Sequence, residues 1–458
     1  MPQPALRTVT LGCKVNQYET EYVGEGLRSA GYRNAADGEP AQVCIVNTCT
    51  VTAEGDSKSR QVIRRLARDN PDARIVVMGC YATRDPQAVA ALPGVAEVVT
   101  DKRELPDLLG RFGVADVPDG ISHFGTRHRA YVKVQDGCLL RCSFCIIPQV
   151  RPTMQSRPPD AILNEVRRLV ENGYREIVLT GIHLGHYGVD FNRGRDKSHW
   201  TRLSHLLDRI VAEVPGDFRV RLSSIEATEV TRELVDVMAA HPRHICPHLH
   251  ISMQSGSDAV LRRMRRRWGA QRFVDRCRLV QERLDAPAIT TDVIVGFPGE
   301  TEDEFAATLR VCETVGFSKI HIFPFSARRG TPAADMPDQL SKGEKSQRVA
   351  RLAALETVLR DRYFRSLLGR PLEVLTESFP GESADSPGGE ICRGTSCRYA
   401  PVEFVAGSEG KPGGKEKQSL GCFVTVLAER ASSDCVTGRL IGAARLVRTG
   451  KHSSAQLV

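Results

Sequence analysis

The sequence predicts an α/β protein in three parts: an amino-terminal domain with a parallel sheet, a central partial (β/α)6 barrel of the TIM type, and a small carboxyl-terminal β-barrel. Short apolar strands alternate with helical stretches over about the first hundred residues, longer alternation follows, and short strands without helices come last. We place the domains at residues 4–115, 124–361 and 364–447. The 458 residues suit about three domains, and 41% apolar content suffices for their cores.

In the amino-terminal part, three predicted strands each end directly before a cysteine. Strands over residues 8–12, 43–48 and 74–79 precede Cys13, Cys49 and Cys80. Adjacent parallel strands bring their carboxyl ends to one edge of a sheet, so we expect these thiols to meet. They form either an iron–sulfur site with an open corner or a group of ordinary strand-end cysteines, and the spacing leaves both open. Cys44 lies within its strand and is predicted to be buried.

The central part contains six predicted βα units, which is typical of an open or partial barrel. We expect its strands near residues 131–135, 176–180, 219–224, 248–253, 289–295 and 319–325. The first helix has Asp160 as its N-cap and stops at Gly173. Barrel enzymes build their sites at the carboxyl ends of the strands, and the glycine-containing and polar motifs fall there.

Three cysteines follow the first barrel strand in the spacing C-x3-C-x-aromatic-C. Cys138, Cys142 and Cys145 offer three thiolates, and Phe144 is the aromatic residue. A cubane iron–sulfur cluster normally takes four thiolates, so this loop leaves one iron free to bind a substrate. A structural zinc site needs four closed ligands, no second cysteine pair lies nearby, and disulfide pairing leaves one thiol over. The loop therefore predicts a reactive iron–sulfur site.

Two histidine patterns are assigned no function. Residues 244–250 alternate His and Cys along a strand, as zinc sites do, but we favour an ordinary barrel strand whose alternating positions fill the core or face helices. His183 and His186 follow the second barrel strand, and neither has an evident carboxylate partner in the sequence.

After residue 370 the pattern changes to short strands. They lie near residues 371–376, 401–405, 421–427 and 438–446, and predict a small β-barrel similar to oligonucleotide-binding modules. Between residues 381 and 417 Gly, Ser, Pro and charged residues dominate, which predicts long loops or an insertion.

The charge balance favours a polyanionic partner. There are 63 Lys and Arg against 55 Asp and Glu, a net charge of +8. Five arginines between Arg262 and Arg267 stand beside Trp268, which suggests a phosphate-contacting face, although the run alone favours a solvated helix surface. Fourteen cysteines without a disulfide framework, no secretory signal pattern and no bilayer-length apolar stretch lead us to expect a cytoplasmic protein without membrane contact.

The C-x3-C-x-aromatic-C loop resembles that of the radical SAM superfamily, in which a reduced [4Fe-4S] cluster with a free iron binds S-adenosylmethionine and cleaves it to a 5′-deoxyadenosyl radical. The resemblance implies that Phe144 lies by the adenine of the cosubstrate. It also implies that Gly181 and the loop after it, Glu226 and Gln254 help to hold S-adenosylmethionine. A cysteine-bearing α/β domain before this core and a small β-domain after it are similar to the methylthiotransferase family over almost the whole chain.

Residues around the first cysteines narrow the resemblance. LGCKVNQYET at 11–20, NTCTVT at 47–52 and DSKSRQ at 56–61 look like the branch that modifies N6-threonylcarbamoyladenosine at position 37 of tRNA. This implies a second [4Fe-4S] cluster on Cys13, Cys49 and Cys80 that carries the sulfur to be transferred. One S-adenosylmethionine then serves as methyl donor and another as radical source, and C2 of the adenine receives the methylthio group.

The resemblance further implies a tRNA anticodon arm as substrate, an external electron donor, and an RNA-binding TRAM domain at the carboxyl end. Rival hypotheses are methylthiolation of isopentenyladenosine in tRNA or of a ribosomal-protein aspartate, and a non-catalytic RNA-binding iron–sulfur protein. One stretch departs from the family, which usually has an aromatic residue and then Arg-Gly after Ile147-Pro148. This chain has Gln149, Val150, Arg151 and Pro152 there.

Overall fold

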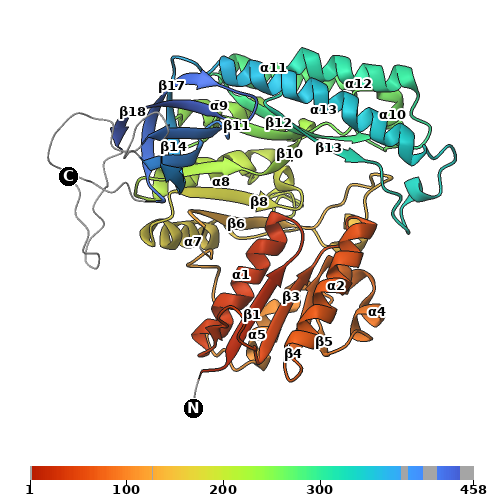
Figure 1. Cartoon of the computed structure of the whole chain (residues 1–458), viewed down its shortest axis with the longest axis vertical. Coiled ribbons are helices and arrows are strands. Elements are labelled where there is room, and N and C mark those ends of the chain that lie inside the picture. Colours follow the sequence, from red (N-terminus) through yellow and green to blue (C-terminus); the bar gives the residue numbers. More distant parts are fainter. Residues whose placement is uncertain (1–2, 126, 383–389, 406–419, 444–458) are drawn as a thin grey trace.

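Figure 1 shows the computed structural model, which describes residues 3–125, 127–382, 390–405 and 420–443. The amino-terminal sheet lies at one end of the molecule, and the central part lies between it and a layer of long helices. Parallel α/β sheets followed by a closed β-barrel confirm the predicted fold class. None of the helices in the described part of the chain has the length and hydropathy of a membrane span.

The amino-terminal part is a five-stranded parallel sheet in the order β2-β1-β3-β4-β5. Its strands are β1 (Ala5–Thr10), β2 (Arg33–Asn34), β3 (Val43–Thr48), β4 (Arg74–Gly79) and β5 (Val95–Val98). Its helices are α1 (Lys14–Ser29), α2 (Ala53–Asp69), α3 (Cys80–Arg84), α4 (Pro86–Ala90), η1 (Lys102–Glu104) and α5 (Leu105–Arg111). Alternate residues of β3 face opposite sides, so Ile45 packs with α1 and α5 and Cys44 with α2. Cys44 is buried, as predicted.

The central part is an open barrel whose strands fall into two sheets, β7-β6-β8-β9 and β10-β11-β12-β13. The strands are β6 (Arg129–Asp136), β7 (Gln155–Ser156), β8 (Glu176–Gly181), β9 (Arg219–Leu222), β10 (Ser224–Glu226), β11 (His248–Ser252), β12 (Ala288–Val295) and β13 (Lys319–Pro324). Except for the short antiparallel β7, neighbouring strands run parallel. An isolated parallel bridge from Val220 to Ile245 connects the two sheets.

Helices cover the outer face of these sheets (Figure 1). They are α7 (Pro159–Glu171), α8 (Leu203–Glu213), α9 (Arg232–Ala240), α10 (Asp258–Arg263), α11 (Ala270–Arg283), α12 (Glu302–Val315) and α13 (Lys342–Arg365). Short helical turns are α6 (Ile147–Val150), η2 (Leu184–His186), η3 (Lys197–His199), η4 (Ala227–Glu229) and η5 (Pro332–Ala334). One large apolar core fills the space between helices and strands.

Two local predictions for the central part need correction. The predicted strand over residues 219–224 is interrupted at Ser223, and its halves β9 and β10 pair with different neighbours. Helix α7 begins at Pro159, so Asp160 lies in its first turn and is not its N-cap; proline has the helical φ and needs no backbone donor there. Gly173 ends this helix in the left-handed region at φ +94°, as predicted.

The carboxyl-terminal part is a closed barrel in the order β14-β15-β16-β18-β17. Its strands are β14 (Pro371–Glu382), β15 (Glu390–Ser396), β16 (Pro401–Val405), β17 (Phe423–Ala431) and β18 (Val436–Ala443). The expectation of loops over 381–417 is wrong for β15, whose Cys392 enters the barrel core, whereas β16 coincides with the strand predicted near residues 401–405. Residues 383–389 and 406–417 of that stretch lie outside the described residues.

A buried ion cluster around Glu176 joins the closed barrel to the central one. Glu176 at the start of β8 is fully buried and pairs with Arg219 at 2.6 Å and Arg221 at 2.9 Å. Both arginines also donate to backbone carbonyls of the closed barrel, Arg219 to Thr395 and Arg221 to Ser396. Burial would raise the pKa of Glu176, but the two guanidinium groups hold it well below its usual range. The carboxyl-terminal barrel is thus attached across the amino ends of β8 and β9.

We expect Glu176→Gln to destabilise the attachment of the closed barrel by about 3–5 kcal/mol, because it leaves buried arginines without a counter-charge. Thermal unfolding and limited proteolysis measure this as a lower midpoint and earlier cleavage between the two barrels. Glu171→Gln, at an exposed position of α7, is the matched control and should behave as wild type. Equal midpoints for Glu176→Gln and wild type would show that the cluster does not stabilise the junction.

Candidate functional site

The loop after β6 brings its three cysteines to one cavity of about 150 Å³. Cys138, Cys142 and Cys145 all line it. The loop enters through Gly137 at φ +75°, where a Cβ atom would collide with the carbonyl oxygen of Thr153. The backbone N–H of Cys145 donates to the carbonyl of Cys142 at 3.2 Å, which folds the loop back on itself. The thiols therefore face a common space at the carboxyl end of the first barrel strand.

Three of the four residues predicted to hold a cosubstrate line the same cavity: Phe144, Glu226 and Gln254. Gln254 is held in the left-handed region at φ +69°, its N–H donating to the carbonyl of Asp292 and its carbonyl accepting from Ile294. Gly181 does not line the cavity; the residues after it, Ile182 and His183, do.

One of the arginines between Arg262 and Arg267 lies at this cavity, so these residues do not only form the phosphate-contacting face that the sequence suggests. Arg266 is buried and its Nη1 donates to Cys142 Sγ at 3.3 Å. It also pairs with Glu226, which accepts a further hydrogen bond from Trp268 Nε1 at 3.3 Å. Trp268 is only 6% exposed, so it is not part of an exposed phosphate-contacting face. The carboxylate partner of Trp268, Glu226, is the last residue of β10, and the local sequence does not reveal this contact.

His183 and His186 share a carboxylate partner, Glu229, which the sequence does not reveal. Their rings stack with centroids 3.6 Å apart, and each Nε2 lies 3.6 Å from the carboxylate of Glu229 in η4. Burial would raise the pKa of Glu229, but the two histidines lower it well below its usual range. His183 Nδ1 also lies 3.7 Å from Cys138 Sγ. The trio therefore packs against the cysteine loop.

Neither cysteine set converges on a single ion. Among the described residues, the one set of three His, Cys, Asp or Glu ligand atoms within 4.8 Å of one another is His183, His186 and Glu229. Two sulfur ligands of one zinc ion lie no more than about 4.6 Å apart, twice the zinc–sulfur distance. In neither set, therefore, do all three sulfurs lie close enough together to share one zinc ion.

The three amino-terminal cysteines meet at the carboxyl edge of their sheet, as predicted. Cys13 precedes α1, Cys49 follows β3, and Cys80 begins α3. Gly12, at φ +107°, lies so close to Cys49 that an added Cβ atom would be 3.0 Å from the Cβ atom of Cys49. Burial raises the pKa of the Cys13 and Cys49 thiols. A metal group bound there must displace their protons.

A buried arginine connects the two cysteine sets. Arg151 follows α6, and its Nε lies 3.5 Å from Cys80 Sγ. The guanidinium pairs with Glu19 of α1 and Asp136 of β6, each at 2.8 Å, and donates to Asn16 Oδ1 at 2.9 Å. Cys80 also packs with Ile146 and Val150, directly after the cysteine loop. The sequence departs from the family pattern at this position, but it does not predict any contact of Arg151.

The charges of this network are fixed by their pairing. Burial would raise the pKa of Glu19, but Arg151 and Lys133 lower it to about 2. Lys133 Nζ donates to Glu19 at 2.9 Å and to Asp136 at 2.6 Å. Two cations and two anions thus form one compact buried group between α1 and β6.

Residues 132–312 match the model of the radical SAM superfamily, and residues 6–101 match "Uncharacterized protein family UPF0004". The chain is 43% identical to the threonylcarbamoyladenosine tRNA methylthiotransferase MtaB of Bacillus subtilis, over 80% of this chain and 84% of that protein. Identity to the protein of the same name from Chlamydia pneumoniae is 39%, over 95% and 98%.

A second group of relatives has a different printed substrate. The tRNA-2-methylthio-N(6)-dimethylallyladenosine synthase of Corynebacterium urealyticum is 37% identical over 83% of this chain and 74% of that protein. Among solved structures, the radical S-adenosylmethionine methyltransferase TsrM of Kitasatospora setae aligns with a TM-score of 0.52 at 15% identity, over 72% of this chain and 77% of that one. This likeness supports the fold.

We expect Arg151→Met to lower the free energy of unfolding of the metal-free protein by about 3–5 kcal/mol at neutral pH, because it strips the guanidinium from two buried carboxylates. The pKa of Glu19 is lowered from 4.5 to about 2 in the folded protein, so the stabilisation is complete above about pH 4.5 and is lost as the pH falls toward 2. Urea titrations at several pH values should show that the difference in free energy of unfolding between wild type and Arg151→Met decreases as the pH falls. Arg272→Met, at an exposed position of α11, is the control; a pH-independent difference would contradict the account.

Proposed function

The chain belongs to the radical SAM tRNA methylthiotransferases, and on this premise we propose that it inserts a methylthio group at C2 of N6-threonylcarbamoyladenosine at position 37 of tRNA. The observation that carries the proposal is that Arg151 contacts both three-cysteine sets: its Nε lies 3.5 Å from Cys80 Sγ, and its carbonyl accepts a hydrogen bond from the N–H of Cys138 at 3.3 Å. The substrate branch is supported by the identity of 39–43% to relatives named for threonylcarbamoyladenosine, against 36–37% to relatives named for dimethylallyladenosine.

We assign one [4Fe-4S] cluster to Cys138, Cys142 and Cys145 and a second to Cys13, Cys49 and Cys80. The donor sets suit the clusters, because each offers three free thiols, and thiolates are the ligands of iron–sulfur clusters. When bound, the first cluster supplies the electron that cleaves S-adenosylmethionine, and the second supplies the sulfur to be methylated and transferred.

The residues around the two sets have separate tasks in this proposal. Arg266 donates to Cys142 Sγ and Arg151 donates to Cys80 Sγ, so each thiolate set has one buried cation against it. Phe144 offers an aromatic face to the adenine of S-adenosylmethionine. Glu226, fixed by Arg266 and Trp268, and Gln254 present polar groups to the rest of the cosubstrate. The loop after Gly181 contributes through Ile182 and His183.

We further propose that the closed barrel within residues 364–447 is an RNA-binding TRAM domain that holds the tRNA anticodon arm. The closed-barrel architecture supports this assignment, and the net charge of +8, which belongs to the chain as a whole, favours a polyanionic substrate. Residues 4–115 would then carry the sulfur-donating cluster and residues 124–361 the radical chemistry. An external electron donor and a cytoplasmic location complete the proposal.

Nucleoside mass spectrometry tests the reaction and the substrate branch together. The full-length protein is expressed in a host that lacks tRNA methylthiolation, and its tRNA is digested to nucleosides. We expect a methylthio mass increase on N6-threonylcarbamoyladenosine. An increase on isopentenyladenosine instead would keep the mechanism and overturn the substrate. No increase despite two loaded clusters would favour a protein substrate or the non-catalytic hypothesis.

Cysteine replacements separate the tasks of the two sets. We expect Cys142→Ala to abolish cleavage of S-adenosylmethionine. Replacement of Cys80 by Ala should leave cleavage intact and stop formation of the methylthio product. Production of 5′-deoxyadenosine and of methylthiolated nucleoside, measured in the same reaction, gives both readouts, and Cys277→Ala in the barrel core controls for loss of a cysteine elsewhere. Cleavage that survives both replacements would refute the assignment of the clusters.

A further inference from the structure

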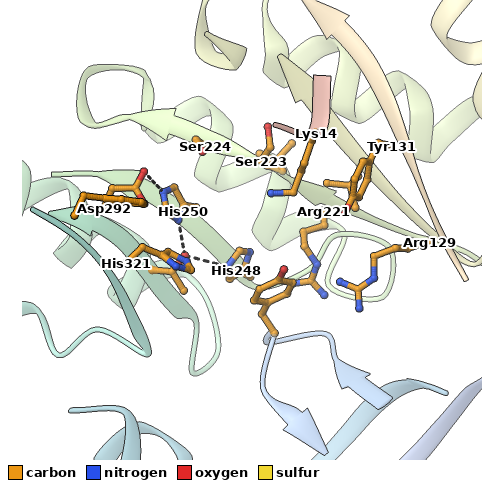
Figure 2. Close-up of a pocket in the computed structure, with 15 residues that line it drawn as sticks. Lys14, Arg129, Tyr131, Arg221, Ser223, Ser224, His248, His250, Asp292 and His321 are labelled. Atoms are coloured by element: carbon orange, nitrogen blue, oxygen red, sulfur yellow. Dashed lines mark hydrogen bonds and ion pairs between the residues drawn. The ribbon is translucent and has the colours of Figure 1, made fainter. Parts of the chain in front are cut away.

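A second cavity, of about 280 Å³, lies inside the central barrel (Figure 2). Its walls are alternate side chains of the barrel strands, among them Tyr131, Ser223 and His250. Tyr399, between β15 and β16, closes the amino end by stacking on His248 with ring centroids 4.9 Å apart. A water molecule occupies about 30 Å³, so the cavity has the volume of about nine water molecules.

His248 and His250 therefore do not fill a core, contrary to the sequence-based expectation. Leu249 and Ile251, the residues between and after them, do pack with the helices outside the barrel. The histidines point inward, where His250 contacts Thr290 at 3.0 Å and Asp292 at 3.2 Å (Figure 2). Ser223, where the sheet is interrupted, also lines this cavity.

The cavity contains one cation without a counter-ion. Arg129 and Arg221 line its floor, but both pair with Glu176. Lys14, the first residue of α1, is half-buried and reaches into the cavity from the amino-terminal domain (Figure 2). Within the part of the chain that the structure describes, no carboxylate lies within 4.0 Å of its ammonium group; Asp292, the acid of the cavity, pairs with His250. The charge of Lys14 is thus available to a ligand.

Two more buried polar atoms of the cavity have neither a hydrogen bond nor an ion pair among the described residues: Ser223 Oγ and His248 Nδ1. His250 Nε2 also lacks a hydrogen bond, but it lies 3.2 Å from the carboxylate of Asp292. Burial holds the pKa of His248 well below its usual range, so this imidazole is neutral at physiological pH. An unsatisfied buried polar atom is costly, and an apolar ligand would leave both atoms unsatisfied. The cavity therefore suits an anionic ligand with further hydrogen-bonding groups.

The location of the cavity connects it to the proposed chemistry. Ser224 lines both this cavity and the one that contains Cys138, Cys142 and Cys145. At the other side, Lys14 directly follows Cys13 of the amino-terminal set. A base placed between the two cysteine sets could thus extend an exocyclic substituent into the interior cavity.

We propose that this cavity binds the N6 substituent of the target adenosine and that Lys14 determines specificity by pairing with the carboxylate of its threonyl group. The proposal rests on the proposed function. A threonylcarbamoyl group carries a carboxylate, a hydroxyl and an amide, and can satisfy Lys14, Ser223 and His248 together. A dimethylallyl group is wholly apolar and leaves all three unpaired, which is the situation in which a polar site rejects a ligand most strongly.

The test combines a change in the protein with a change in the substrate. Full-length wild type and Lys14→Met, both with reconstituted clusters, are assayed on two anticodon stem-loops. One carries N6-threonylcarbamoyladenosine, and in the other the threonyl carboxylate is replaced by an uncharged carboxamide. We expect wild type to prefer the carboxylate by about 10- to 100-fold in kcat/KM. Lys14→Met should lose about that factor on the carboxylate and should no longer distinguish the two substrates.

Controls separate a binding role from damage to the neighbouring cluster. Lys342→Met, at an exposed position of α13, should keep the wild-type preference. Iron content and the visible spectrum of Lys14→Met should equal those of wild type. If the clusters of Lys14→Met are damaged, two other measurements test the role of Lys14. These are the preference of wild type for the carboxylate substrate over the carboxamide, and the same preference measured for Lys14→Arg, which keeps the positive charge.

Two different failures are distinguishable. A wild type that methylthiolates both stem-loops equally, or a Lys14→Met variant with intact clusters that still prefers the carboxylate, would overturn the role of Lys14 while the proposed function stands. A wild type that modifies neither stem-loop but modifies one carrying isopentenyladenosine would overturn the proposed function and the inference with it.

Discussion

The buried guanidinium of Arg151 is the contact on which the two-site arrangement depends. It connects a carboxylate of the amino-terminal helix α1 with one of the barrel strand β6, and its remaining N–H lies against the sulfur of Cys80. A buried arginine is tolerated only where its charge and its donors are all engaged. Since α1 also begins directly after Cys13, the same contact that joins the two domains fixes one cysteine set relative to the other.

The opposite end of the barrel follows the same principle with different residues. Glu176 gathers arginines of β9 and thereby attaches the closed carboxyl-terminal barrel, whose Tyr399 becomes the floor of the interior cavity. The cavity is thus enclosed by all three parts of the chain: Lys14 from the amino-terminal sheet, strand residues from the centre, and Tyr399 from the carboxyl end. No single part contains it.

Local sequence pattern predicts the regular parts of the fold well. The bounds of β3 and β4 agree with those predicted, since each strand is an apolar run that ends at a cysteine. What the pattern cannot supply is partnership over long distances. Arg151, Arg266 and Glu229 obtain their roles from residues on other elements, and the strand β15 is hidden because its Gly, Arg and Thr residues obscure the alternation.

The central claim is that one chain holds two clusters, of which only one binds S-adenosylmethionine. Its most direct test is the iron and sulfide content of the anaerobically reconstituted protein, together with electron paramagnetic resonance of the reduced protein with and without S-adenosylmethionine. The account predicts about eight iron atoms per chain, four for each cluster. It also predicts two signals, of which S-adenosylmethionine alters one. About four iron atoms per chain and a single signal would contradict it.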